Sequence, residues 1–271
     1  MTELQNFVPD LMAEMRRLAI IAGHEILKIY QSDDFGIKTK SDESPVTLAD
    51  EAADAIISAG LSKRFADIPL VTEEQAQSHR GSHDRFLIVD PLDGTKEFIH
   101  KRGEFTVNIA LVENGVPVIG VVYAPVLGRL FYTDTRSSAV EELAPFDENN
   151  KGRCKQIKVT EPDNDALVVV ASKSHRDAAT DTYISLYKVA DFTSAGSSLK
   201  FCLLATGEAD FYPRLGRTME WDTAAGDALL RAAGGHVVDF ETKLPLLYGK
   251  SDYANPFFIA FAQGVNLQEE N

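Results

Sequence analysis

A segment near residue 90 combines oxygen-rich side chains with a rigid turn. Residues 86–89 are a short apolar run with β-branched members, typical of a buried strand, and they lead directly into Asp90-Pro-Leu-Asp-Gly-Thr95. Pro91 cannot donate to a strand ladder, so the strand should end there, and the Asp-Gly pair that follows is a turn signal. Two carboxylates three residues apart, with the Leu92 carbonyl between them and Thr95 beside them, are the oxygen ligands that Mg²⁺ prefers.

Four further acidic residues lie in segments where each has an ordinary structural explanation. Asp50 stands in the first turn of an expected helix, where the helix dipole favours an acid. Glu73 and Glu74 are typical of solvated charge on a turn, and in extended backbone only one of them can face a metal ion. Asp222 has the position of an N-cap, because small and apolar residues follow it.

Three separate strings nevertheless resemble segments of one family. Asp90-Pro-Leu-Asp93-Gly-Thr95 is similar to the metal-binding signature of the inositol monophosphatase superfamily, whose members are Mg²⁺-dependent, lithium-sensitive phosphatases. Glu220-Trp-Asp-Thr-Ala-Ala-Gly226 resembles its second signature, and Ser44-Pro-Val-Thr-Leu-Ala-Asp50 resembles the segment with an acid that faces the catalytic water. The resemblance covers nearly the whole chain, and it implies the layered α/β/α/β/α sugar-phosphatase fold.

The resemblance also implies a set of metal ligands. Glu73, Asp90 and the Leu92 carbonyl would hold one Mg²⁺ ion, and Asp90, Asp93 and Asp222 a second. A third, loosely held ion is expected near Glu73, with Glu74 as support. Lithium would inhibit by competing for the second position.

The same resemblance implies a catalytic group beside the metals. Asp50 and Thr95 would orient and deprotonate the attacking water, with Glu73 contributing through its metal ion. The N–H groups of Gly94 and Thr95 would hold the phosphate at a helix start. Two divalent ions can activate a water and stabilise a leaving oxygen, which suits phosphate monoester hydrolysis.

A further group of residues resembles the 3′(2′),5′-bisphosphate nucleotidase branch of the superfamily. The matching segments are Ser174-His175, Gly196-Ser-Ser-Leu-Lys200 and Tyr212-Pro-Arg214, whereas the Arg usual in the inositol branch is replaced by Thr193 and Ser194. The resemblance implies a nucleotide pocket lined by His175, Ser197, Lys200, Arg214 and Asp222. Lys200 and Arg214 are the candidate partners of a phosphate that does not react.

We therefore expect a phosphatase that removes the 3′-phosphate of adenosine 3′,5′-bisphosphate, giving AMP and phosphate, and so supports sulfate assimilation. An inositol monophosphatase or another sugar phosphatase is the alternative within the family. The alternative that is not an enzyme is a binding module on the same fold that senses metal or lithium. A phosphate-release assay separates it from the two phosphatases.

The elements expected to position these residues form an α+β pattern. Apolar residues at helical spacing predict helices over 7–30 and from Thr47 or Asp50 onward. Three strands should form an antiparallel meander, with Asn114-Gly115 as a hairpin turn. The remaining expected elements are short helices at 96–100, 180–187 and from 196, strands at 105–112, 116–123, 129–133, 167–171 and 209–214, a helix from Asp222 to Gly234-Gly235, and a polar stretch over 134–165 with a loop at 147–158.

Composition limits the classes of partner. The chain has 271 residues, 44% of them hydrophobic, and a formal net charge of −14, which disfavours nucleic-acid binding through a basic surface. Cys154 and Cys202 lack the spacing of a zinc site, and no apolar run predicts a signal peptide or an integral membrane segment. We expect one catalytic unit over 1–271 that can be divided into a metal-site half (1–140) and a nucleotide-pocket half (160–271). We expect it in the cytoplasm or loosely associated with the inner membrane, and the sequence leaves its oligomeric state open.

Overall fold

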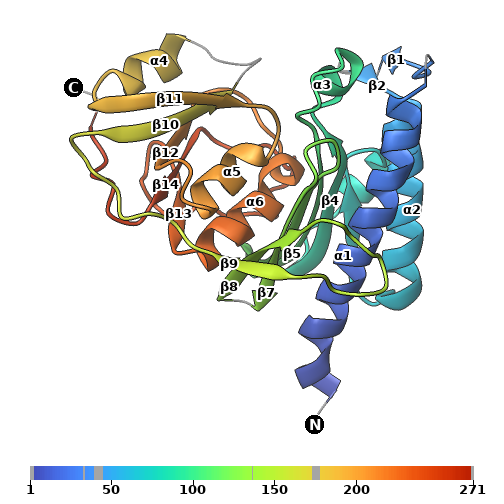
Figure 1. Cartoon of the computed structure of the whole chain (residues 1–271). Helices are drawn as coiled ribbons and strands as arrows, with labels where there is room; N and C mark the ends of the chain where they lie inside the picture. The colour runs from blue at the N-terminus through green and yellow to red at the C-terminus, as the bar shows by residue number, and fades with distance from the viewer. Residues whose placement is uncertain (1–2, 33, 40–44, 136, 173–177, 270–271) are drawn as a thin grey trace.

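The computed structural model describes residues 3–32, 34–39, 45–135, 137–172 and 178–269. Within them, helices and sheets alternate in five layers (Figure 1). The long helices α1 (Glu3–Tyr30) and α2 (Leu48–Arg64) cover one face of a seven-stranded sheet, and α5 (Leu199–Ala205) and α6 (Glu220–Ala232) fill the space between this sheet and a five-stranded one. The short helix α4 (Ala178–Ile184) packs on the outer face of the second sheet. The expected α/β/α/β/α fold is confirmed.

The seven-stranded sheet is the predicted meander with additions at both edges. Its order follows the chain from β3 to β9, and only β3 and β4 pair in parallel. Asn114 and Gly115 both have positive φ (50° and 77°), the backbone required in a two-residue hairpin turn of this kind. The strands are β3 Leu70–Thr72, β4 Arg85–Asp93, β5 Thr106–Glu113, β6 Val116–Ala124, β7 Arg129–Thr135, β8 Ser138–Leu143 and β9 Cys154–Ile157.

Strand β4 corrects one prediction, because it does not end at Pro91. It pairs with β5 as far as Asp93, and the register shifts between Asp90 and Asp93. Pro91 lies within this shift, where the regular ladder that needs an N–H donor is interrupted. The irregularity carries Asp90 and Asp93 to the edge of the cavity described below.

The stretch 134–165 was also wrongly expected to be without strands, since it contains β8 and β9. These polar strands are anchored by Arg16 of α1, whose guanidinium donates to both carboxylate oxygens of Glu142 at 2.6 and 2.7 Å. Arg16 also donates to the carbonyls of Asp147 and Asn150. The expected loop therefore exists over 147–153, but residues 154–157 form β9.

The five-stranded sheet has the order β11-β10-β12-β14-β13, in which β12 and β13 run antiparallel to β14. Strand β11, which was not predicted, runs parallel to β10. The strands are β10 Leu167–Ser172, β11 Val189–Ala195, β12 Phe211–Arg214, β13 Gly235–Asp239 and β14 Phe258–Ala262, and the remaining short elements of the chain are β1 Lys38–Thr39, β2 Pro45–Val46, the 3₁₀ turn Ala76–His79 and α3 Thr95–Ile99.

Helix α6 ties the two sheets together. Its residues pack against β4, β5, β6 and β13, and a Cβ on Gly120 of β6 would lie 2.4 Å from the Ala225 carbonyl. Only glycine permits so close an approach of strand and helix.

The division of the chain into two halves stays a prediction. Among the described residues, no helix is both long and apolar enough to cross a membrane.

Candidate functional site

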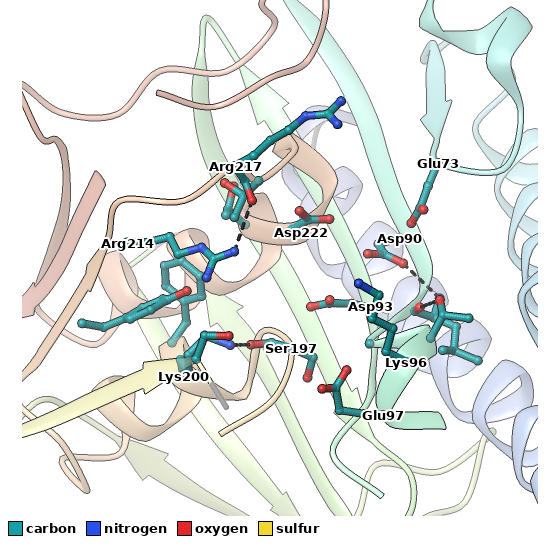
Figure 2. A pocket seen from close by; sticks show the side chains of 18 of the residues that line it. Glu73, Asp90, Asp93, Lys96, Glu97, Ser197, Lys200, Arg214, Arg217 and Asp222 are labelled. Carbon is teal, nitrogen blue, oxygen red and sulfur yellow. Dashed lines mark hydrogen bonds between the residues drawn. The ribbon is translucent and has the colours of Figure 1, made fainter. Parts of the chain in front are cut away.

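A cavity of about 280 Å³ lies where the edge of the seven-stranded sheet meets α5, α6 and β12. Figure 2 shows acidic side chains on one side of it and Lys200 and Arg214 on the other. We call Glu73, Asp90, Asp93 and Asp222 the acid cluster, and Lys200, Arg214 and Arg217 the cation wall. The cavity is lined by Pro45, Glu73, Asp90, Leu92, Asp93, Gly94, Thr95, Lys96, Glu97, Ser172, Ser197, Lys200, Phe201, Tyr212, Arg214, Arg217, Thr218, Asp222 and Thr223.

Three members of the acid cluster converge closely enough to share a cation. Glu73, Asp90 and Asp222 each offer a carboxylate oxygen, and these oxygens lie within 4.8 Å of one another. Burial, followed by the negative charge of Glu73, raises the pKa of Asp90 well above its usual range, and burial followed by Asp93 raises that of Asp222. A divalent cation would relieve this repulsion, so the donor set fits a metal ion.

Asp93 is held at the edge of this group by neutral donors. Its Oδ2 lies 3.1 Å from the Ser198 hydroxyl and 3.3 Å from Asn108 Nδ2. Burial raises the pKa of Asp93 to about 6, although Lys200 and these two donors oppose the shift. The turn itself is fixed by the Leu92 N–H, which donates to Asp90 Oδ1 at 3.1 Å.

Asp50 and Thr95, 45 residues apart in sequence, form a hydrogen-bonded pair. The Thr95 hydroxyl donates to Asp50 Oδ1 at 3.0 Å and lies 3.4 Å from the Leu92 carbonyl oxygen. The other carboxylate oxygen, Asp50 Oδ2, accepts from the Thr47 N–H and hydroxyl at 2.7 and 2.6 Å. This capping box explains why a buried acid is stable at the start of α2, and its burial raises the pKa of Asp50.

Gly94 allows the chain to turn from β4 into α3. It has a φ of 96°, and a Cβ there would lie 3.3 Å from both the Glu104 carbonyl oxygen and the Phe105 side chain. A side chain would therefore be strained in two ways. Gly94 and Thr95 both line the cavity, in the position expected of groups that hold a phosphate.

The cation wall is more buried than the sequence suggests. Lys200 is 5% exposed and Arg214 is 8% exposed. Lys200 Nζ donates to the Ser197 carbonyl at 2.5 Å, and burial lowers the pKa of Lys200 to about 8 while the charge of Asp93 acts in the opposite direction. Arg214 Nη2 donates to the Arg217 carbonyl at 3.2 Å. The Arg217 side chain itself is exposed and lies at the rim of the cavity.

The structure thus places the predicted residues together, with two corrections and one gap. Helix α6 begins at Glu220, so Asp222 is its third residue rather than the N-cap, and Asp222 Oδ2 accepts from the Met219 N–H at 2.7 Å. Helix α5 begins at Leu199 rather than Gly196. Predicted His175 lies outside the described residues.

Several residues of the site were not predicted. Asn108 and Ser198 support Asp93, and Lys96, Glu97 and Arg217 line the cavity. Lys96 and Glu97 follow directly on the first signature, so their proximity could have been read from the string itself. Arg217 lies between the end of β12 and the start of α6, three residues before the second signature, and it also lines the cavity.

Comparison with known proteins gives a consistent picture. The model of the "Inositol monophosphatase family" matches residues 10–267. Proteins named 3′(2′),5′-bisphosphate nucleotidase CysQ from Salmonella typhimurium and Escherichia coli K12 are each 44% identical over 92% of this chain and 98% of their own. The crystal structure of CysQ from Bacteroides thetaiotaomicron is similar with a TM-score of 0.82, at 39% identity over 94% of this chain and 97% of that one. An inositol monophosphatase from Thermotoga maritima has a TM-score of 0.73 at 27% identity, over 92% of this chain and 91% of its own.

Proposed function

Since the chain belongs to the inositol monophosphatase family, we propose that it is a Mg²⁺-dependent 3′(2′),5′-bisphosphate nucleotidase. It hydrolyses the 3′-phosphate of adenosine 3′,5′-bisphosphate to AMP and phosphate, a reaction that supports sulfate assimilation. The observation that carries this proposal is one cavity in which the acid cluster faces the buried cations Lys200 and Arg214. A doubly phosphorylated substrate needs both, because only one of its phosphates reacts.

The acid cluster has the donors for the metal ions. Glu73, Asp90 and the Leu92 carbonyl would hold one Mg²⁺, and Asp90, Asp93 and Asp222 a second, with a third near Glu73. When bound, Mg²⁺ lowers the pKa of water and neutralises charge that develops on phosphate oxygens. The buried carboxylates, whose mutual repulsion raises their pKa values, are kept ready for such cations by the surrounding hydrogen bonds.

The Asp50–Thr95 pair handles the proton of the attacking water. Since the Thr95 hydroxyl donates to Asp50, its lone pairs face outward and can accept from a water at the edge of the cavity. Asp50 orients that hydroxyl and takes up the proton as the water attacks phosphorus. The Gly94 and Thr95 N–H groups bind the phosphoryl oxygens, which orients the ester for attack.

The other wall binds the part of the substrate that does not react. Arg214 and Lys200 would hold the 5′-phosphate, and Ser197 and His175 are further expected contacts of the nucleotide. A planar guanidinium suits bidentate contact with phosphate, and the low exposure of Arg214 strengthens such a pair.

The proposal is tested by a substrate panel assayed under saturating Mg²⁺. Adenosine 3′,5′-bisphosphate should be hydrolysed with a much higher kcat/KM than myo-inositol 1-phosphate or a simple sugar phosphate. A preference for myo-inositol 1-phosphate would make the chain an inositol phosphatase. No phosphate release from any substrate would favour a binding module.

We also expect lithium to inhibit by competing with Mg²⁺ for Asp90, Asp93 and Asp222. Its apparent inhibition constant should therefore depend on Mg²⁺ concentration, which an activity titration against both ions measures. Full activity at high lithium concentration would contradict this. The cytoplasmic location, with or without loose association with the inner membrane, stays a prediction that cell fractionation tests.

A further inference from the structure

Glu97 is a buried carboxylate that the mechanism above does not use. It is 3% exposed, and its Oε1 has no hydrogen-bond partner among the described residues. The nearest cation is Arg102, whose Nη1 lies 3.9 Å from Oε1, beyond hydrogen-bond distance and on a side chain that is 43% exposed. Glu97 lines the cavity, where this oxygen is closed to water and would reach a bound molecule by rotation of the side chain.

A second unsatisfied oxygen lies beside it. The Ser197 hydroxyl is buried, lines the same cavity and also has no hydrogen-bond partner within the part of the chain that the structure describes. Gly196, which precedes Ser197, packs against Glu97, since a Cβ on Gly196 would lie 3.1 Å from Glu97 Cγ. Figure 2 shows the Ser197 and Glu97 side chains on the same side of the cavity. Buried polar atoms are nearly always satisfied, so two adjacent exceptions in a cavity indicate a ligand group.

The chemistry of the pair defines that group. A carboxylate accepts hydrogen bonds and donates none, whereas a serine hydroxyl can do both. A ligand hydroxyl can donate to Glu97 and at the same time accept from Ser197, which a phosphate oxygen cannot do. The pair therefore suits a hydroxyl and disfavours a second phosphate.

The position of the pair indicates which hydroxyl it is. Figure 2 shows Glu97 on the side of Lys200 where Asp93 and the rest of the acid cluster lie. Glu97 is also two residues from Thr95, at the start of the same short helix. A hydroxyl bound here is thus one close to the scissile ester.

We propose that Glu97 and Ser197 bind the hydroxyl vicinal to the scissile phosphate ester, which is the ribose 2′-hydroxyl of adenosine 3′,5′-bisphosphate. This inference rests on the proposed function and adds a specificity element to it. The enzyme would discriminate ribonucleotide from 2′-deoxyribonucleotide substrates, because the analogue without the hydroxyl leaves both protein groups unpaired.

The test compares adenosine 3′,5′-bisphosphate with its 2′-deoxy analogue in the wild type and in a graded series. We expect the wild type to favour the ribonucleotide by about ten- to a hundredfold in kcat/KM. Glu97→Gln, which keeps one acceptor without the charge, should retain part of that ratio, and the similarly sized Glu97→Met should reduce it to about one. Ser197→Ala should lower it independently, and Glu141→Gln, on a partly buried glutamate outside the cavity, should leave it unchanged.

The outcomes are separable. A wild-type ratio near one, or an undiminished ratio in both Glu97→Gln and Ser197→Ala, overturns the inference even if adenosine 3′,5′-bisphosphate is a good substrate. Inosine 3′,5′-bisphosphate, which lacks the adenine amine, serves as a further arm. If the Glu97 variants lose discrimination against inosine instead of against the deoxy sugar, Glu97 binds the base and the inference fails. No turnover of either bisphosphate by the wild type shows that the proposed function itself is wrong.

Discussion

The two sides of the cavity differ in how the chain builds them. Two of the four acids in the acid cluster, Asp90 and Asp93, come with Gly94 and Thr95 from one continuous segment where β4 passes into α3, and Glu73 and Asp222 join them from elsewhere. The cation wall comes from two places, Lys200 on α5, and the end of β12 with the loop that follows, which carries Arg214 and Arg217. The first side is thus built around a local sequence string, whereas the second has no such central string.

This difference corresponds to a difference in task. Buried acids that repel one another need a rigid frame, and here backbone and side-chain donors such as Leu92 N–H and Met219 N–H provide it. By our proposal the cations would face the part of the substrate that does not react, and Arg217 at the rim is exposed. We therefore expect changes in the acid cluster to abolish chemistry on every substrate, and changes in the cation wall to alter the choice of substrate.

The largest effect is expected from Asp93→Asn. Loss of this charge weakens a metal position that the transition state requires, so kcat/KM should fall by about 10³-fold or more on all phosphate esters. The fold should persist, because removal of one acid relieves repulsion in the absence of metal. Phosphate release and a thermal melt in chelator test the two halves of this prediction, and near-normal turnover at saturating Mg²⁺ would contradict the first.

Metal removal should make stability depend on pH. The pKa of Asp93 is raised from 3.8 to about 6 by burial, and burial also raises the pKa values of Asp90 and Asp222. A group with a raised pKa in the folded state stabilises the protein at low pH, and this stabilisation is lost as pH rises from the unfolded value through the folded value. The Tm in chelator should therefore fall as the pH rises from about 4 through about 6 and beyond.

Saturating Mg²⁺ should reverse that fall, because it binds the ionised carboxylates of the folded state alone. We expect the gain in Tm on adding Mg²⁺ to be larger at pH 8.0 than at pH 5.5, by about 5 °C or more. Asp93→Asn, measured in chelator, should show a shallower dependence on pH. Parallel Tm profiles with and without Mg²⁺ would show that the acids are not the metal site.

The same contrast between local and tertiary specification explains what the sequence could predict. The Asp90–Thr95 string encodes a strand end, a glycine turn and a helix start within ten residues, so its geometry follows from local rules and from the family resemblance. The Asp50–Thr95 pair was also predicted, although only through the resemblance, and their hydrogen bond is present in the structure. The catalytic and metal roles of these residues stay predictions.

Other features depend on contacts that no local pattern reveals. Strand β8 contains the acidic residue Glu142, which is buried only because it pairs with Arg16, 126 residues away. In the sequence this acid looks like a solvent-exposed loop residue. Strand β11 was missed because most of its residues are exposed, so it lacks the apolar pattern of a buried strand. Asp222 was predicted to be an N-cap, but it is the third residue of α6. There its carboxylate accepts from the Met219 N–H, a contact that the sequence pattern does not reveal. The burial of Glu97 requires the turn at Gly196, which lies far along the chain.

A smaller and more selective effect is expected from Arg214→Ala. Loss of a charge-assisted pair should lower kcat/KM for adenosine 3′,5′-bisphosphate by about ten- to a hundredfold, and leave a small monophosphate within about threefold of the wild type. Arg153→Ala, which removes an exposed arginine outside the cavity, is the matched control. Equal losses on both substrates would mean that Arg214 supports the fold or the acid cluster rather than the second phosphate.

The smallest effect concerns the residue that joins the two sides. Ser198 is 1% exposed, directly precedes α5, and its hydroxyl lies 3.1 Å from Asp93 Oδ2 and 2.6 Å from the Asp222 carbonyl oxygen. It also accepts from Asn108 Nδ2 at 2.9 Å. Since a single proton serves two acceptors, Ser198→Ala removes less than a full charge-assisted bond from Asp93, and Asn108 remains as a donor.

We therefore expect Ser198→Ala to raise the Mg²⁺ concentration needed for half-maximal activity by about five- to tenfold, with kcat at saturating Mg²⁺ nearly unchanged. Ser185→Ala, an exposed serine that caps the end of α4, controls for loss of a hydroxyl. A Mg²⁺ titration at fixed substrate measures the shift. If instead KM for the bisphosphate rises at every Mg²⁺ concentration, Ser198 acts through Lys200 on the cation wall, and the two sides are coupled through α5 rather than through Asp93.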